Sequence, residues 1–72
     1  MAEPTLKKGS KGNPVRRLQL TLSLGGHDTK GVDGHFGGNT ESAVKRLQKD
    51  AALNADGVVG PDTWARVNSL GD

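Results

Sequence analysis

Four side chains that can bind a metal ion or transfer a proton fall within nine residues of one glycine-rich loop. They are His27, Asp28, Asp33 and His35. Zinc peptidases use His and Asp as ligands and a Glu as the base, drawn from distant segments. The chain has only two His, and both of its Glu lie outside this loop, so a third distant ligand is missing. The sequence therefore predicts neither a metal ion nor a cofactor here.

Other chemistries find no better support in this loop. Lys30 and Val32 occupy ligand positions between Asp28 and Asp33, which excludes the spacing of a calcium-binding loop. The chain has no cysteine, and therefore no thiolate nucleophile and no disulfide. No Ser–His–Asp pattern is recognisable either. We expect no catalytic residue, and we interpret the loop as a binding surface.

A ligand is expected to contact the loop at 25–38 and the start of the helix that follows it. Polar side chains there surround glycine backbone, which a ligand can approach closely. The candidate ligand-binding residues are His27, Asp28, Asp33, Gly34, His35, Gly37, Asn39 and Arg46. Arg46 lies further along the expected helix, where it can pair with a carboxylate. The alternative, that both histidines are simply solvated loop residues, stays open.

Three helices are expected to position this loop. Residues at i, i+3, i+4 and i+7 form one stripe suited to burial in each of three segments. The expected helices cover residues 14–24, 39–50 and 61–70. Asn13 can cap the first of them, and Pro14 suits its first turn. The predicted fold class is all-α, a compact three-helix bundle with glycine-rich connecting loops.

A short pattern, D-G-x-[FV]-G-x-x-T, appears twice, starting at Asp33 and at Asp56. VRRLQ and VKRLQ form a second echo at a different spacing, so the chain is not a uniform solenoid. The Asp can accept backbone N–H bonds in a tight turn, and the Gly after it, Gly34 or Gly57, can adopt a positive φ. We interpret the pattern as a turn that launches a helix.

Length and charge limit the remaining classes. The 72 residues suffice for one domain with a net charge of +2, and its two aromatic residues, Phe36 and Trp64, are the largest expected core side chains. Five of the ten basic residues lie in the first 20 positions, and they form no dense basic stripe. About ten residues precede the third expected helix, whereas a helix-turn-helix uses a turn of about 3–4 residues. A nucleic-acid-binding three-helix domain is therefore a less favoured alternative.

The two turns, with the VRRLQ and VKRLQ helices, resemble the bacterial three-helix peptidoglycan-binding domain. That module is attached to cell-wall amidases, muramidases, carboxypeptidases and phage endolysins. The resemblance covers about residues 6 to 70. Its matching positions are Gly9, Gly12, Val15, Leu18, Gln19, Gly34, Phe36, Gly37, Thr40, Ala43, Val44, Gln48, Leu53, Asp56, Gly57, Val59, Gly60, Thr63 and Trp64. Leu47 departs from the usual Phe, and Ala52 stands where a Gly commonly ends the second helix, with strain if that site is left-handed.

The resemblance implies non-catalytic binding of cell-wall peptidoglycan, through the stem peptide with some glycan contact. The partner would be peptidoglycan, with a cell-wall hydrolase or a particle component attached, and the module would be a monomer that binds no nucleic acid and enters no membrane. An alternative is a structural or interaction module of a phage or contractile-injection particle.

The same resemblance sets the expected domain and its place of action. Residues 1–5 are expected to be a flexible lead-in, and residues 6–72 a single peptidoglycan-binding domain. The site of action would be the cell wall, the periplasm or the exterior. No secretory signal is visible, so delivery by a larger protein, a phage or a secretion apparatus is expected.

Overall fold

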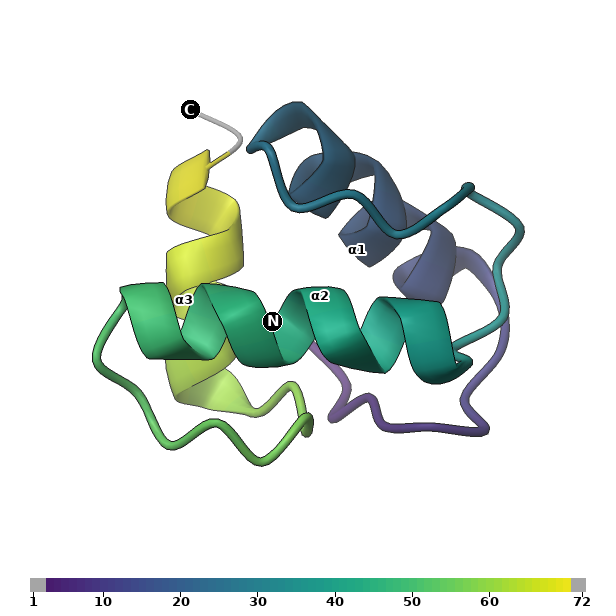
Figure 1. Cartoon of the computed structure of the whole chain (residues 1–72). Helices are drawn as coiled ribbons and strands as arrows, with labels where there is room; N and C mark the ends of the chain where they lie inside the picture. The colour runs from purple at the N-terminus through teal and green to yellow at the C-terminus, as the bar shows by residue number, and fades with distance from the viewer. Residues whose placement is uncertain (1–2, 71–72) are drawn as a thin grey trace.

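The computed structural model describes residues 3–70, and within them the chain forms three α-helices and no strand (Figure 1). They are α1 (Asn13–Leu24), α2 (Gly38–Asp50) and α3 (Pro61–Leu70). α1 packs against both α2 and α3. The predicted all-α three-helix bundle is therefore confirmed, while residues 1–2 and 71–72 of the expected lead-in and domain lie outside the described residues.

The core consists of aliphatic side chains and two aromatic rings. Each helix contributes one stripe of its surface to it. Trp64 is 3% exposed and Phe36 is 2% exposed. This confirms the expectation that the two aromatic side chains are core residues. The buried apolar cluster consists of Leu6, Val15, Leu18, Leu22, Phe36, Ala43, Val44, Leu47, Val59, Trp64 and Val67.

The N-terminal segment, residues 3–12, contains a turn and is hydrogen-bonded to the loops before α2 and α3. Leu6 and Val59 exchange both backbone bonds, at 3.1 and 2.7 Å. Gly9 donates to the carbonyl of Phe36 at 2.8 Å. Pro4, which belongs to the expected lead-in, accepts a hydrogen bond from Trp64 Nε1 at 2.6 Å. This segment therefore ties both loops and α3 together, and we call it the N-terminal strap.

The start of α1 differs from the expectation. Asn13 does not cap the helix, because the capping position is Gly12 and no side chain bonds to the free N–H groups. Gly12 has φ 110°, a value that glycine adopts readily, and its carbonyl accepts the Arg16 N–H at 3.1 Å. Asn13 is thereby moved into the helix as its first residue. α2 likewise begins at Gly38, one residue before its expected start.

The turns before α2 and α3 have the backbone that the repeated pattern predicts. Gly34 has φ 78° and Gly57 has φ 76°, which confirms the expected positive φ at both. Ala52 also has a positive φ, 58°, just after the end of α2. A side chain at that φ is disfavoured, so the departure from glycine noted at this position places local strain there.

Candidate functional site

Gln19 of α1 fixes the turn that leads into α2. Its side chain is 1% exposed, and its Oε1 accepts the N–H groups of Asp33 and Gly34 at 3.1 and 2.9 Å. Its Nε2 lies 3.0 Å from Asp33 Oδ1, 2.9 Å from the His35 carbonyl and 3.0 Å from Thr40 Oγ1. We call these five residues the first clamp. One buried amide thus joins α1, the turn and the first residues of α2.

Gln48 of α2 makes the equivalent contacts with the turn that leads into α3. Its Oε1 accepts the Gly57 N–H at 3.0 Å. Its Nε2 lies 3.1 Å from Asp56 Oδ1, 3.0 Å from the Val58 carbonyl and 3.1 Å from Thr63 Oγ1. We call this set the second clamp. The two clamps explain the repeated sequence pattern, because the Asp and the Thr of each copy contact one buried Gln.

Sequence reasoning missed the role of these two glutamines. The echo between VRRLQ and VKRLQ was noted, but it was not connected to contacts between the glutamines and the turns. The signal was present, since each R-L-Q precedes one D-G-x-[FV]-G-x-x-T pattern. A buried amide needs hydrogen-bond partners, and a tight turn presents free N–H and carbonyl groups.

The clamps also hold two aspartates in the ionised form. The backbone N–H of His35 and then the Gln19 amide lower the pKa of Asp33 below its ordinary value of 3.8, although partial desolvation opposes them. The Val58 N–H lowers the pKa of Asp56 in the same way; the Gln48 amide adds to it and desolvation again opposes. Both carboxylates are charged at neutral pH, and each accepts a backbone N–H hydrogen bond that stabilises its turn.

Beside the first clamp lies a hollow of about 110 Å³. Its lining residues are Gln19, Thr29, Lys30, Asp33, His35, Gly37, Gly38, Asn39 and Thr40. We call it the α2 pocket, because it surrounds the N-terminal end of α2. No side chain caps that end, where Gly37 is the capping residue. The free N–H groups and the helix dipole therefore favour a negatively charged or carbonyl group.

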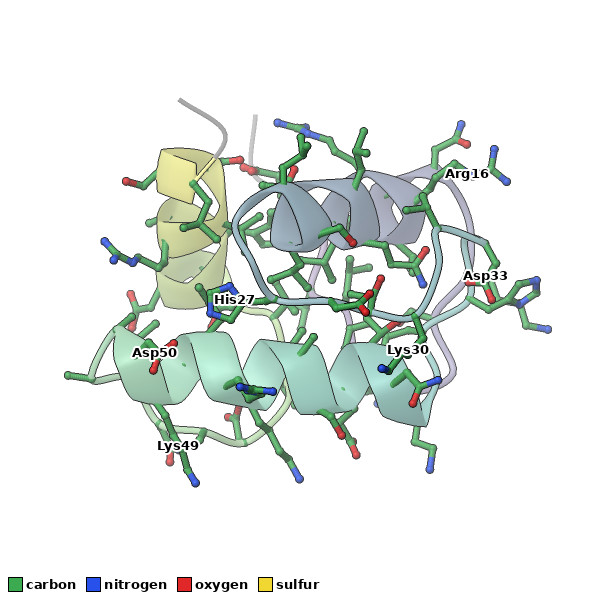
Figure 2. The ribbon with its side chains drawn as sticks, turned by 45° about the horizontal axis from the view of Figure 1, so that its top comes forward. Arg16, His27, Lys30, Asp33, Lys49 and Asp50 are labelled. Atoms are coloured by element: carbon green, nitrogen blue, oxygen red, sulfur yellow. The ribbon has the colours of Figure 1, made fainter. Side chains whose placement is uncertain are left out.

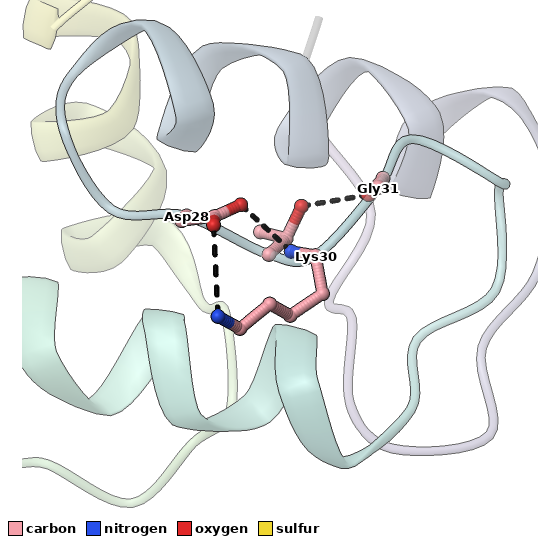
Figure 3. A network of polar contacts seen from close by, with 4 residues as sticks. Asp28, Lys30 and Gly31 are labelled. Carbon is pink, nitrogen blue, oxygen red and sulfur yellow. Dashed lines mark hydrogen bonds and ion pairs between the residues drawn. The ribbon is translucent and has the colours of Figure 1, made fainter.

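Lys30 lies over the start of α2 because of an unusual local backbone (Figure 2). Its φ is 64°, and its N–H donates to Asp28 Oδ1 at 2.8 Å. Its ammonium lies 3.8 Å from Asp28 Oδ2, and Thr29 Oγ1 donates to the Gly31 carbonyl at 2.7 Å (Figure 3). Lys30 was absent from the candidate residues, since sequence spacing does not reveal a left-handed lysine.

The structure brings four of the eight candidate residues together. Asp33, His35, Gly37 and Asn39 line the α2 pocket. Gly34 is buried, and its N–H is already bound by Gln19.

The remaining three candidates lie outside this lining. Asp28 does not line the pocket but contacts Lys30, which does. Arg46 is exposed on α2, about 10 Å along the axis from Asn39 at 1.5 Å per residue. Ligand contact at all eight candidates stays a prediction.

His27 lies against the opposite end of α2. Its Nε2 is 3.2 Å from Asp50 Oδ2, at the last residue of that helix (Figure 2). Its backbone N–H donates to the Leu22 carbonyl at 2.8 Å. The His27 side chain is only 14% exposed, whereas His35 is exposed. The alternative that both histidines are simply solvated therefore fails for His27, whereas the His35 side chain is exposed to solvent.

The α2 pocket offers hydrogen-bond donors together with one cation, Lys30, and one anion, Asp33. Among residues 3–70, no group of three or more His, Asp or Glu side chains lies together as a metal site would require. None of the helices in that range is long and apolar enough to cross a bilayer. The arrangement suits reversible binding of a small polar group.

The comparisons with known proteins agree with this architecture. The sequence model of the family described as "Putative peptidoglycan binding domain" matches residues 11–67. The zinc D-Ala-D-Ala carboxypeptidase of Streptomyces albus G is 40% identical over 72 residues, covering 94% of this chain and 28% of that enzyme. This chain therefore spans less than a third of the carboxypeptidase.

Two solved structures are similar over nearly the whole chain. The SleB N-terminal domain has a TM-score of 0.93 at 29% identity, covering 100% of this chain and 99% of that one. A peptidoglycan-binding protein from Clostridioides difficile, solved in complex with glutamine hydroxamate, has a TM-score of 0.92 at 38% identity. That match covers 97% of this chain and 44% of the Clostridioides difficile chain.

Proposed function

This chain belongs to the peptidoglycan-binding domain family, and we propose that it binds bacterial cell-wall peptidoglycan without catalysing a reaction on it. The observation that carries the proposal is the uncapped start of α2 in a hollow that Lys30 also lines. Free N–H groups and an ammonium together select a carboxylate or a polarised carbonyl. The stem peptide of peptidoglycan supplies both.

In this proposal the α2 pocket holds one carboxylate or peptide carbonyl of the stem peptide. The N–H groups of α2 and the Lys30 ammonium bind its oxygens, and Asn39 and His35 add side-chain hydrogen bonds at the rim. Arg46, further along α2, binds a second carboxylate or a glycan hydroxyl. One shallow pocket gives weak affinity, and repeated ligands along a polymer raise the effective concentration.

The proposed role in the cell is to hold an attached activity at the wall. The chain covers 28% of the carboxypeptidase it resembles, so we propose a similar place as one module of a larger hydrolase or assembly. The module would act as a monomer at the cell wall, delivered by that larger protein, a phage or a secretion apparatus. Its basic N-terminal third would favour approach to an anionic envelope in a salt-sensitive way.

The test of the proposed function is capture on purified insoluble sacculi, with chitin and DNA as controls. We expect retention on sacculi and on neither control. An NMR titration with a muropeptide should shift amides at residues 27–40. Shifts confined to residues 7–17 that disappear on adding salt would instead indicate non-specific electrostatic attraction.

The double variant His35→Ala with Asn39→Ala should weaken sacculus binding at least about fivefold, as expected for two lost ligand bonds of about 0.5–1.5 kcal/mol each. Its melting temperature should stay within about 2 °C, because the first clamp uses the His35 backbone and not its ring. Lys30→Gln should weaken binding as well. Lys8→Gln, an equal charge change on an exposed residue outside the pocket, is the matched control. Equal effects of the two lysine variants would contradict the proposed site.

A further inference from the structure

The second clamp places another hollow at the start of α3, with a volume of about 180 Å³. Its lining residues are Gln48, Leu53, Asn54, Asp56, Val58, Gly60, Pro61, Asp62 and Thr63. We call it the α3 pocket. It stands beside Gln48 as the α2 pocket stands beside Gln19, so the internal repeat has produced two hollows in equivalent places.

Aligning the two clamps shows where their linings differ. Gln48, Asp56, Gly60 and Thr63 repeat the residue types of the α2 pocket at equivalent positions. The remaining positions have changed chemistry. In the α3 pocket the position of His35 is occupied by Val58, that of Gly38 by Pro61 and that of Asn39 by Asp62. The common positions include the hydrogen-bonded residues of the clamp, and the chemistry of the hollow changes at the other positions.

The altered positions make the α3 pocket apolar with an acidic rim. Leu53 and Val58 are half-buried, and Pro61 completes the apolar wall. Asp62 is exposed in the first turn of α3, and the lining contains no Lys, Arg or His. Asp56 Oδ1 is bound by Gln48 Nε2 and the Val58 N–H at 3.1 and 2.9 Å. A carboxylate has about four acceptor sites, so Asp56 retains capacity for a further donor.

We propose that the α3 pocket binds a primary ammonium carried on a short aliphatic chain. The Asp62 and Asp56 carboxylates bind the ammonium, while Leu53, Val58 and Pro61 pack against the methylene groups. A hollow of about 180 Å³ has room for one amino-bearing side chain. The α2 pocket has different chemistry, since its lining contains Lys30 and has the uncharged Asn39 at the position of Asp62.

This inference deepens the proposed function and rests on it for the identity of the natural ligand. The amine would be the side-chain amine of the diamino acid of a stem peptide. One pocket would bind a carboxylate and the other an amine, so the module would recognise the direction and the charge of the peptide. A glycan alone supplies neither group in this form.

The direct test is an NMR titration of the whole chain with Nα-acetyl-L-lysine amide. The uncharged control is Nα,Nε-diacetyl-L-lysine amide, which keeps the chain and loses the ammonium. We expect saturable amide shifts at residues 53–63 with the charged probe, and at least fivefold weaker binding of the diacetylated one. Equal binding of the two probes, or shifts spread over all acidic surface residues, would overturn the inference.

Matched variants assign the site. Asp62→Asn should weaken the charged probe at least threefold, and Val58→Lys should abolish its binding by placing an ammonium in the pocket. The clamp uses only the backbone of Val58, so that variant keeps the turn. Glu3→Gln removes an equal charge outside the pocket and should change nothing. Equal losses in Asp62→Asn and Glu3→Gln would show general charge attraction and overturn the assignment.

Sacculi with acetylated amines separate this inference from the proposed function. Acetylation of the sacculi should lower the retention of the parent protein several-fold. It should lower the retention of the Asp62→Asn variant much less. Undiminished retention on acetylated sacculi would overturn the amine site and leave the proposed function standing. Saturable probe shifts at residues 53–63 with no retention on any sacculus would support the amine pocket and contradict the proposed function.

Discussion

Gln48 and Gln19 are the residues on which the connections between helices most depend. Replacing Gln48 by Ala removes the acceptor of the Gly57 N–H and the donor to three oxygens. A buried group left without its partner costs about 1–3 kcal/mol. We expect Gln48→Ala to lower the free energy of unfolding by about 2–4 kcal/mol, measured by urea denaturation.

Gln48→Glu provides a sharper version of the same test. A carboxylate cannot donate, and it would stand 3 Å from the Asp56 carboxylate in a buried position. The Glu variant should therefore be less stable than the Ala variant at pH 7 and should recover on acidification. Ser42→Ala, on the exposed face of α2, is the control. A Glu variant as stable as the parent would show that the clamp contributes nothing.

The two clamped aspartates predict how stability depends on pH. The pKa values of Asp33 and Asp56 are lowered in the folded state, so folding favours their ionised forms. Their contribution is complete above the unfolded pKa near 4 and is lost as pH falls through the lower folded values. The melting temperature should therefore be flat from pH 7 to 5 and fall below pH 4. Asp33→Asn with Asp56→Asn should flatten that decline, and an unchanged acid slope would contradict the assignment.

At the scale of the helices, the end of α2 carries a strained residue beside an unstrained one. Ala52 has φ 58°, whereas Ala51 has φ −91°. A left-handed alanine costs about 1–2 kcal/mol, part of which glycine recovers at the expense of unfolded-state entropy. Ala52→Gly should raise the free energy of unfolding by about 0.5–1 kcal/mol. Ala51→Gly should lower it by a similar amount, so a rise in both variants would rule out backbone strain as the cause.

The helices themselves were predictable because burial repeats every three or four residues. Val15, Leu18 and Leu22 identify α1 without any tertiary information. The cap of α1 was not predictable, since Gly12 takes that place through its backbone conformation.

The site was predictable only in part, because it depends on the path of the chain. The loop after α1 carries His27 to the end of α2 and Lys30 to its beginning. Residues three apart in sequence therefore lie at opposite ends of one helix. Periodicity describes a helix face and contains no information about such a path.

At the scale of the whole molecule, the N-terminal strap joins both loops and α3. Deleting residues 1–4 removes the Pro4 carbonyl that accepts the Trp64 Nε1–H. We expect a loss of about 1–3 kcal/mol in the free energy of unfolding, since the indole N–H is left without its acceptor. Tryptophan fluorescence should shift to longer wavelength as water reaches the ring.

Trp64→Phe supplies the control for that deletion. It keeps a large ring in the core and removes the N–H that needs an acceptor. In a Trp64→Phe background, deleting residues 1–4 should cost less than in the parent. An equal cost in both backgrounds would mean that the strap acts through its other contacts and not through the indole.

We expect the strap to dock late when the molecule folds. The first clamp closes between residues 14 to 21 positions apart and the second between residues 8 to 15 apart, whereas the strap joins Pro4 to Trp64 across 60 positions. Short-range contacts form first, because closing a long loop costs more entropy. Docking of the strap should follow the rate-limiting step. Its removal would then leave the folding rate nearly unchanged and accelerate unfolding, so the strap lengthens the lifetime of the folded molecule.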